Sequence, residues 1–313
     1  MLHFALRRAL QALPIAWLVA TLVFSLLHVV PGDPVEAMLG ENAAPGDVAA
    51  LRAGLGLDRP LVEQYGRFLA GLVRADLGAS LRSGTPVARL LVERWPATLA
   101  LALTSLAIAL ALSLPLGVLA ARRAGGAADR AASALALVGA SVPTFWLGPA
   151  LILIFGIGFD LVPVSGNQGW RSLVLPGLTL GLGIAGLLVR MVRVALAEEL
   201  GRPYVLVALA RGVGGWRATL RHAFRNALPP VITMVALQFG ALLAGAVVVE
   251  TVFSWPGIGR LMVDAIRFRD YPVVQGVVLC IALGYVAANL AADLACAWAD
   301  PRLRDGARLP TPR

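Results

Sequence analysis

Six apolar runs, each long enough to cross a bilayer, limit what this chain can fold into more than any other feature. About 20 apolar residues span a hydrocarbon core roughly 30 Å thick. Water is absent there, so the backbone of each run must satisfy its own hydrogen bonds as a helix. Only 14% of the 313 residues are charged, whereas soluble domains carry about 25%. We therefore predict an all-α membrane protein with six transmembrane helices. The runs are Phe4–Val30, Ala97–Ala121, Ala131–Ile157, Leu173–Val192, Val231–Phe253 and Val273–Ala299.

Two of these runs allow a second interpretation. The first resembles a cleaved signal peptide, but such peptides have an apolar region of about 7–15 residues and a small-x-small cleavage site. Phe4–Val30 is longer and ends in HVVPGDP, so we expect an uncleaved span. The third run contains Pro143, which either kinks the helix or is accommodated within it. The sequence leaves both possibilities open.

The basic residues predict the topology. All 27 are arginines, and basic residues gather at the cytoplasmic ends of membrane helices. They are frequent at the start of the first run, at residues 122–130 and 190–225, and after residue 300. We therefore expect both termini in the cytoplasm, and we expect no nucleic-acid partner. Because lysine is absent, no G-x-x-x-x-G-K-[ST] phosphate loop can form, so any ATP must bind another chain.

The least hydrophobic section, residues 31–95, predicts a small helical insertion on the extracytoplasmic side. Within it, Leu61–Val73 has apolar residues at three- and four-residue spacing, which is typical of an amphipathic helix. Thr85-Pro86 before VARLLVERW indicates a second helix. The insertion is either a packed cap or a surface that docks a receptor. The chain then divides into an N-terminal segment with the first span (1–30), the insertion (31–95), a five-helix core (96–303) with a cytoplasmic loop at 193–228, and a cytoplasmic tail (304–313).

No pattern indicates catalysis or a metal site. The sequence lacks H-x-x-x-H, C-x-x-C and paired-carboxylate motifs, and its three histidines lie on different segments. Cys280 and Cys296 are about 24 Å apart along one predicted helix, too far for a disulfide. The G-x-G-x-x-G pattern at residues 181–186 lies inside a span, so we interpret it as helix packing. An intramembrane enzyme is thus disfavoured, and so is a channel, whose filter needs a repeated ring of polar groups.

Four residues are candidates for a translocation pathway or gate. Gly240 and Ala244 belong to small-xxx-small pairs, which favour close helix contact. Glu250 and Asp293 are carboxylates within apolar runs, where charge is costly unless it meets water or a partner. Ordinary packing or an interhelical hydrogen bond is the simpler interpretation, and a pathway-lining role is the hypothesis.

The basic stretch from Arg190 to Pro230 is patterned as a docking element. It contains a helical run, a central Gly212 and a stop at Pro229-Pro230. Glycine permits a left-handed turn between two short helices, and Ala208 would let the first helix approach a partner closely. We interpret the loop as the place where force from a separate protein enters this chain.

At this loop the sequence resembles a known family. The segment YVLVALARG, followed by ATLRHAFRNALPPVIT, is similar to the coupling segment of ABC-importer permeases of the dipeptide, oligopeptide and nickel group. The resemblance extends from Arg7 to Arg304 with order and spacing kept. It is also carried by LGLDRPLVEQYGRFLAGLVRADLGAS, PVARLLVERWPATLALA, VPTFWLG, VVVETVFSWPGIGR, RDYPVVQG and DPRLR.

The resemblance implies which residues couple the chain to its motor. Importer permeases generally carry E-A-A-x-x-x-G here, and this chain keeps only the second alanine and the glycine. Leu206 and Val207 stand where the pattern has glutamate and alanine. We therefore do not expect the salt bridge that the glutamate forms in other permeases. The candidate coupling residues are Tyr204, Ala208, Arg211, Gly212, Arg217, Arg221, His222, Arg225 and Asn226.

The resemblance also implies the partners and the activity. Such permeases pair with a second, homologous permease, two cytoplasmic ATPase subunits that bind ATP and Mg²⁺, and an extracytoplasmic substrate-binding protein. This chain would carry no cofactor and no enzymatic step, and it would work by alternating access in a bacterial inner membrane. Import of di- or oligopeptides is the expected function, with nickel or a metal chelate as the alternative substrate.

Overall fold

The computed structural model describes residues 2–29, 35 and 44–299. Within these residues the secondary structure is helical, apart from one isolated bridge between Ala79 and Pro86. The predicted tail (304–313) and most of residues 30–43, at the start of the predicted insertion, lie outside the described part. The structure thus supports an all-α membrane protein.

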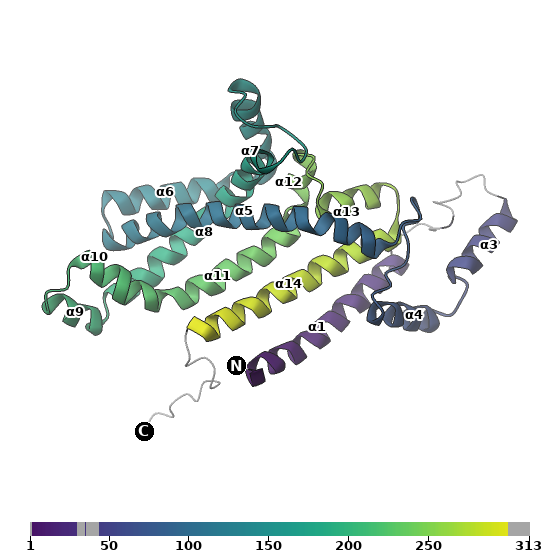
Figure 1. Ribbon diagram of the computed structural model, residues 1–313, viewed down its shortest axis with the longest axis horizontal. Helices are drawn as coiled ribbons and strands as arrows, with labels where there is room; N and C mark the ends of the chain where they lie inside the picture. The colour runs from purple at the N-terminus through teal and green to yellow at the C-terminus, as the bar shows by residue number, and fades with distance from the viewer. Residues whose placement is uncertain (1, 30–34, 36–43, 300–313) are drawn as a thin grey trace.

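The described residues form five helices of more than 20 residues, which run side by side along the molecule (Figure 1). Four helical stretches are long and apolar enough to cross a membrane, and they correspond to the second, fourth, fifth and sixth predicted runs: residues 87–122, 170–200, 215–243 and 271–291. The first and third runs contain shorter apolar stretches, Leu13–Ser25 and Thr144–Gly158. The long helices are α1 (Leu2–Val29), α5 (Val87–Arg122), α8 (Val174–Leu200), α11 (Phe224–Gly245) and α14 (Tyr271–Ala299).

Helix α8 is the most enclosed of the candidate spans, and its glycines explain why. A Cβ on Gly181 would lie 2.8 Å from the carbonyl oxygen of Ser105 on α5. A Cβ on Gly186 would lie 2.4 Å from the carbonyl oxygen of Ala136, on α6 (Ala127–Ser141). Both distances are shorter than real Cβ contacts. The G-x-G-x-x-G pattern therefore brings backbones together, which confirms the packing interpretation.

The third predicted run is interrupted at Pro143. Helix α6 ends at Ser141, and Pro143 has an extended backbone (φ −64°, ψ 138°) before α7 (Thr144–Leu151) begins. Proline disfavours the helical conformation of the preceding residue, which here is Val142. Helix α7 continues into the π-helical turn η1 (Ile152–Gly158) and points away from α6 (Figure 1). Of the two possibilities, the structure shows an interruption.

The insertion contains α3 (Pro45–Leu55) and the predicted amphipathic helix, which is confirmed as α4 (Leu61–Val73). Helix α4 packs on α1, where Tyr65 and Phe68 lie 5.2 and 5.6 Å from the ring of Phe24. The predicted helix at VARLLVERW and the second predicted span form one continuous helix, because α5 passes through Pro96. Packing holds it together there: a Cβ on Gly284 of α14 would lie 2.6 Å from the Trp95 ring.

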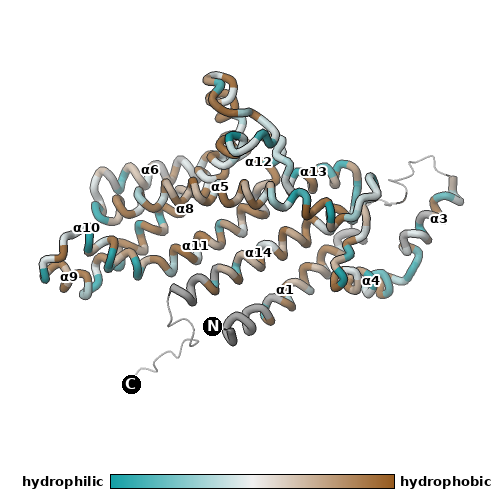
Figure 2. Tube along the Cα trace, viewed as in Figure 1, coloured by the Kyte–Doolittle hydropathy of each residue, from teal (hydrophilic) through white to brown (hydrophobic). Residues whose placement is uncertain are grey.

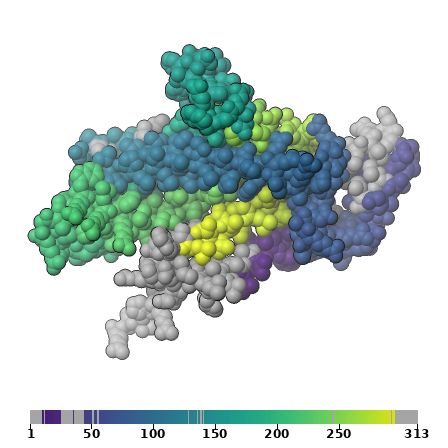
Figure 3. All heavy atoms as spheres, viewed as in Figure 1, coloured from purple at the N-terminus to yellow at the C-terminus, as the bar shows by residue number. Residues whose placement is uncertain are grey.

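The distribution of hydropathy follows this arrangement. Apolar residues cover most of the long helices, while hydrophilic residues gather near the short helices at one end and around α3, α4 and α13 (Ile258–Arg267) at the other (Figure 2). In the space-filling view, α5 forms a band along much of the length of the visible face (Figure 3).

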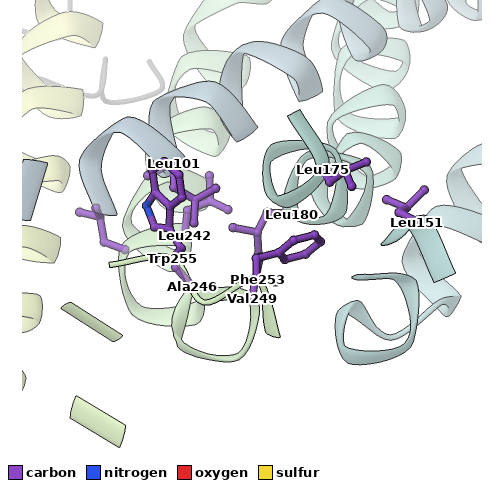
Figure 4. Close-up of a cluster of buried hydrophobic side chains, with 11 residues drawn as sticks. Leu101, Leu151, Leu175, Leu180, Leu242, Ala246, Val249, Phe253 and Trp255 are labelled. Atoms are coloured by element: carbon purple, nitrogen blue, oxygen red, sulfur yellow. The ribbon is translucent and has the colours of Figure 1, made fainter. Parts of the chain in front are cut away.

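A buried apolar cluster joins α5, α8 and α11 to α12 (Val247–Val252) (Figure 4). Trp255, just after α12, is 1% exposed, and its indole N–H donates to the carbonyl oxygen of Ala97 at 2.8 Å. The indole thereby gains both burial and a hydrogen-bond partner. The cluster contains Leu101, Ala102, Leu151, Leu175, Leu180, Leu242, Leu243, Ala246, Val249, Phe253 and Trp255.

Candidate coupling segment

A short helix and a tight turn follow the end of α8. Arg202 is extended, and Pro203 begins α9 (Pro203–Ala210); proline suits a first helical position because it lacks an N–H. The Gly212 N–H donates to Leu209 O at 2.9 Å and the Val213 N–H donates to Ala208 O at 3.1 Å. These two bonds form a Schellman motif. Gly212 has φ +83°, so the left-handed turn predicted there is present.

The chain then returns through a second short helical stretch. It comprises α10 (Gly215–Arg217) and the π-helical η3 (Ala218–Ala223), which leads directly into α11. The two short stretches lie together at one end of the molecule, beyond the ends of α8 and α11 (Figure 1). The predicted helix–glycine–helix pattern is therefore what the chain forms.

Apolar contacts fix this tip to the long helices. Val205 of α9 is fully buried, although its neighbours Leu206 and Val207 are 55% and 50% exposed. One side of α9 therefore packs on the molecule while the other side faces outward. The buried cluster contains Val118, Ala121, Val192, Ala195, Leu196, Val205, Ala218, Ala223, Ala227 and Val231.

A polar cluster supports α9 at its base. The Tyr204 hydroxyl donates to the Glu199 carboxylate, and Arg202 pairs with Glu198 at 2.7 Å. Burial raises the pKa of Tyr204, and the hydrogen bond to Glu199 raises it further, while Asn226 of α11 acts in the opposite direction. Three elements thus meet at Tyr204: the end of α8, the start of α9 and the start of α11.

The outward side of the tip is mixed apolar and cationic. Leu209 is 43% exposed, and Ala208 and His222 are half-buried. No three metal-ligating side chains gather in the part of the chain that the structure describes. Such a convex surface is suited to docking rather than to chemistry. Four of its arginines are exposed without an ion pair among the described residues: Arg211, Arg217, Arg221 and Arg225.

Sequence reasoning missed two contacts in this part of the molecule, one between the tip and α5 and one between α8 and α6. The Arg122 guanidinium at the end of α5 lies 3.6 Å from the centroid of the Trp216 ring, a cation–π geometry. Arg193 of α8 forms a two-pronged ion pair with Asp129 of α6, which is 5% exposed. The arginine holds the pKa of Asp129 below its usual value, as does the Gly125 N–H. Trp216 stands out in the sequence as a tryptophan in a basic loop, but its partner Arg122 is 94 positions away and could not be predicted.

The pathway candidates fall in different environments. Gly240 lies against α14, where a Cβ would be 2.5 Å from the Tyr285 ring, so it permits a close helix contact. The side chain of Ala244 lies outside the described residues. Asp293 is half-buried on α14, four residues after Asn289.

Glu250 is fully buried, and each of its carboxylate oxygens accepts a hydrogen bond. Its carboxylate accepts a hydrogen bond from the Thr98 hydroxyl at 2.7 Å and one from the Arg260 N–H at 3.0 Å. The Thr98 oxygen in turn accepts from the Ile258 N–H at 2.8 Å. Glu250 therefore joins α12 to α5 and satisfies the first turn of α13. These bonds explain why a carboxylate is present within an apolar run, which the sequence alone did not show.

Two solved structures share the fold of this chain. Two inward-facing crystal forms of the MetNI methionine ABC transporter match with TM-scores of 0.57 and 0.58. They are 22% and 21% identical in sequence, and each match covers 67% of this chain and 96% of the solved chain. The chain thus has the fold of an ABC-transporter permease.

Sequence comparison places the chain within that class. Residues 113–305 match the binding-protein-dependent transport system inner membrane component family, and residues 1–102 match the N-terminal family of the same components. The chain therefore belongs to this family. It is 39% identical to the dipeptide transport system permease protein DppB of Escherichia coli K12 and 38% identical to the glutathione transport system permease protein GsiC of the same strain. Each match covers 97% of this chain and 99% of the relative.

Proposed function

We propose that this chain is the transmembrane permease subunit of an ATP-driven importer of di- or oligopeptides in a bacterial inner membrane. The observation that carries the substrate class is the identity of 39% with a dipeptide permease over almost the full length of both chains. A second relative, of similar identity, is named for glutathione, which is also a short peptide.

The proposed topology has six spans with both termini in the cytoplasm. Four spans are the long candidate helices, and the other two are α1 and the interrupted α6–α7 pair, which contain the shorter apolar stretches. The arginine-rich tip of α9, α10 and η3 then faces the cytoplasm, as basic segments do. The insertion with α3 and α4 faces the opposite side.

The proposed mechanism is alternating access driven from outside this chain. Two ATPase subunits bind ATP and Mg²⁺, and their closure displaces α9, which docks through its outward side. Val205 and the Tyr204 cluster pass that displacement to α8 and α11. Nucleotide and a substrate-loaded binding protein stabilise different states of the spans, and a peptide crosses between this chain and a second, homologous permease. Gly240, Ala244, Glu250 and Asp293 remain hypothetical contributors to that pathway.

Transport in proteoliposomes tests this proposal. The chain is reconstituted with the second permease and the ATPase subunits, with ATP inside and the binding protein outside, and uptake of a radiolabelled dipeptide is measured. We expect uptake that requires both ATP and the binding protein. Uptake of radioactive nickel in place of the dipeptide would contradict the substrate class. Flux through this chain alone would contradict the ATP-driven mechanism.

A further inference from the structure

Exposed arginines gather at one outer corner of the molecule, where the turn between α13 and α14 meets the loop before α5. Arg267, Arg269 and Arg82 are all exposed. The Arg82 guanidinium lies 3.5 Å from the centroid of the Phe268 ring, so the loop and the turn form one surface. Phe268 itself is 52% exposed. We call Arg82, Arg267, Phe268 and Arg269 the outer basic corner.

The charges of this region nearly balance in the sequence, but its exposed charges are arginines, because Asp264 is half-buried and Asp270 is buried. Residues 254–272 contain three arginines and two aspartates. Asp270 is 4% exposed, and it accepts hydrogen bonds from the Ser80 hydroxyl and from the Leu81 N–H at 3.0 Å. Its charge is therefore used inside the corner to hold the loop in place. None of the three arginines of the corner has an ion pair among the described residues.

Two features make this cationic surface unexpected on the outer side. Short outer loops are normally poor in arginine. In addition, Arg269 has φ +52° and occupies the left-handed position of a Schellman turn, since the Asp270 N–H donates to Ala265 O at 2.8 Å. That position ordinarily favours glycine. An arginine kept under backbone strain is a reason to look for a role of its side chain.

The corner lies beyond the reach of lipid headgroups. Helix α5 has 36 residues, which makes it about 54 Å long, whereas a bilayer with its headgroups is about 40–45 Å thick. In the proposed topology, with Arg122 at the inner surface, α5 still spans about 51 Å at an average tilt of about 20°, so its Val87 end extends past the outer headgroups. Gly276 of α14 packs at the level of Val87, so residues 267–270 lie farther out still. The occupant of the corner is therefore a soluble molecule.

We propose that the outer basic corner docks an acidic surface of the extracytoplasmic binding protein. The inference rests on the proposed function and its topology, and it adds the chemistry of that contact. Arginine and aromatic side chains on a rigid support are typical centres of protein interfaces. Unpaired cations also attract an acidic partner over a distance and increase its association rate.

The test uses the complete transporter in nanodiscs and the binding protein that supports dipeptide uptake. The affinity of the two is measured at low and at physiological salt. For Arg267→Glu/Arg269→Glu we expect binding about tenfold or more weaker at low salt, with a smaller dependence on salt. Arg82→Glu, which changes only the loop, should act in the same direction. Arg267→Lys/Arg269→Lys retains the positive charges and should bind the binding protein with an affinity within about threefold of the wild type. The basal ATPase rate should not change in any variant.

Arg74→Glu is the matched control, since Arg74 is an exposed arginine of the insertion outside the corner. Equal losses in Arg74→Glu and the double variant would overturn the proposal, and so would wild-type affinity in the double variant. An effect that appears only as altered ATPase activity in anionic-lipid nanodiscs would assign the corner to headgroups and also overturn it. If the wild type shows no uptake that depends on a binding protein, the proposed function fails, and this inference fails with it.

Discussion

Two glycines of this chain are required for opposite physical reasons. Gly212 has φ +83°, and no atom lies within 4 Å of the place where a Cβ would be. Its space is free, but its backbone conformation is unfavourable for other residues. Gly257 has an ordinary φ of −96°, yet a Cβ there would lie 2.2 Å from the Glu250 carboxylate. Its conformation is permitted, but its space is occupied.

Gly212→Ala should weaken coupling without preventing membrane insertion. A left-handed alanine costs about 1–2 kcal/mol, so the Schellman turn after α9 becomes less populated. We expect less dipeptide transported per ATP hydrolysed in the reconstituted transporter. Gly214→Ala is the control, because Gly214 has φ −56° and equally free space. The same ratio of transport to hydrolysis in both variants would refute the role of the turn.

Asp129→Asn should lower the thermal stability of the purified chain at pH 7. The ion pair with Arg193 depresses the pKa of Asp129 below its unfolded value of about 3.9. A depressed carboxyl pKa stabilises the folded state above the unfolded pKa, and this contribution is lost as the pH falls through the folded pKa.

The melting temperatures of wild type and Asp129→Asn in detergent should therefore differ at pH 7 and pH 5, begin to converge below about pH 4, and coincide only below the folded pKa. Arg193→Gln should remove the same stabilisation, and the double variant should add little to it. A difference between wild type and Asp129→Asn that is unchanged at pH 3 would show that the ion pair is not its source.

At the scale of elements, the junction of α5, α12 and α13 is held by one buried carboxylate. Glu250 bonds Thr98 of α5 and the Arg260 N–H of α13, and Trp255 bonds the backbone of α5 close by. A buried carboxylate is tolerated when its oxygens are bonded. The junction therefore connects the short helix α13 to the long helix α5.

Gly257→Ala should loosen this junction, because the added methyl group overlaps the carboxylate. Overpacking of a buried site costs about 1–3 kcal/mol, which we expect as a lower melting temperature of the purified chain. Glu250→Ala removes the obstacle but leaves the Arg260 N–H without its partner, so it is also destabilising. The double variant should be clearly more stable than the sum of both losses predicts. Additive losses would mean that the two residues do not interact.

At the scale of the whole molecule, two opposite ends carry the polar features. The coupling tip of α9, α10 and η3 lies at one end, and the insertion and α13 lie at the other (Figures 1 and 2). The arginines of both ends are exposed, so labelling from either side of a membrane can distinguish them.

Single cysteines should therefore be accessible from opposite sides. In a background with Cys280 and Cys296 replaced by alanine, Arg211→Cys should react with a membrane-impermeant maleimide only in inverted vesicles. Ser83→Cys, in the exposed loop before α5, should react only in intact cells whose outer barrier is permeabilised. Labelling of Arg211→Cys from outside would invalidate the proposed topology.

Several features were predictable because their cause is local. Apolar runs of sufficient length predicted the four long candidate spans, and the amphipathic spacing predicted α4 at its exact residues. Gly212 predicted a left-handed turn, since few other residues adopt one readily. The glycines of residues 181–186 indicated packing because they lie in an apolar helix. In each case a residue and its neighbours within a few positions contain the physical reason.

Other features depended on residues far apart in the chain. Glu250 meets Thr98 across 152 positions, and Ser80 meets Asp270 across 190. The helix predicted at VARLLVERW and the second predicted span are one helix, α5, which packs against α14 beside Pro96. Length, hydropathy and turn conformation therefore follow from the sequence by itself, because short-range sterics and the bilayer determine them. The partners of the buried charges, and which arginines stay exposed, were decided by tertiary structure, because only folding brings distant polar groups within hydrogen-bonding distance.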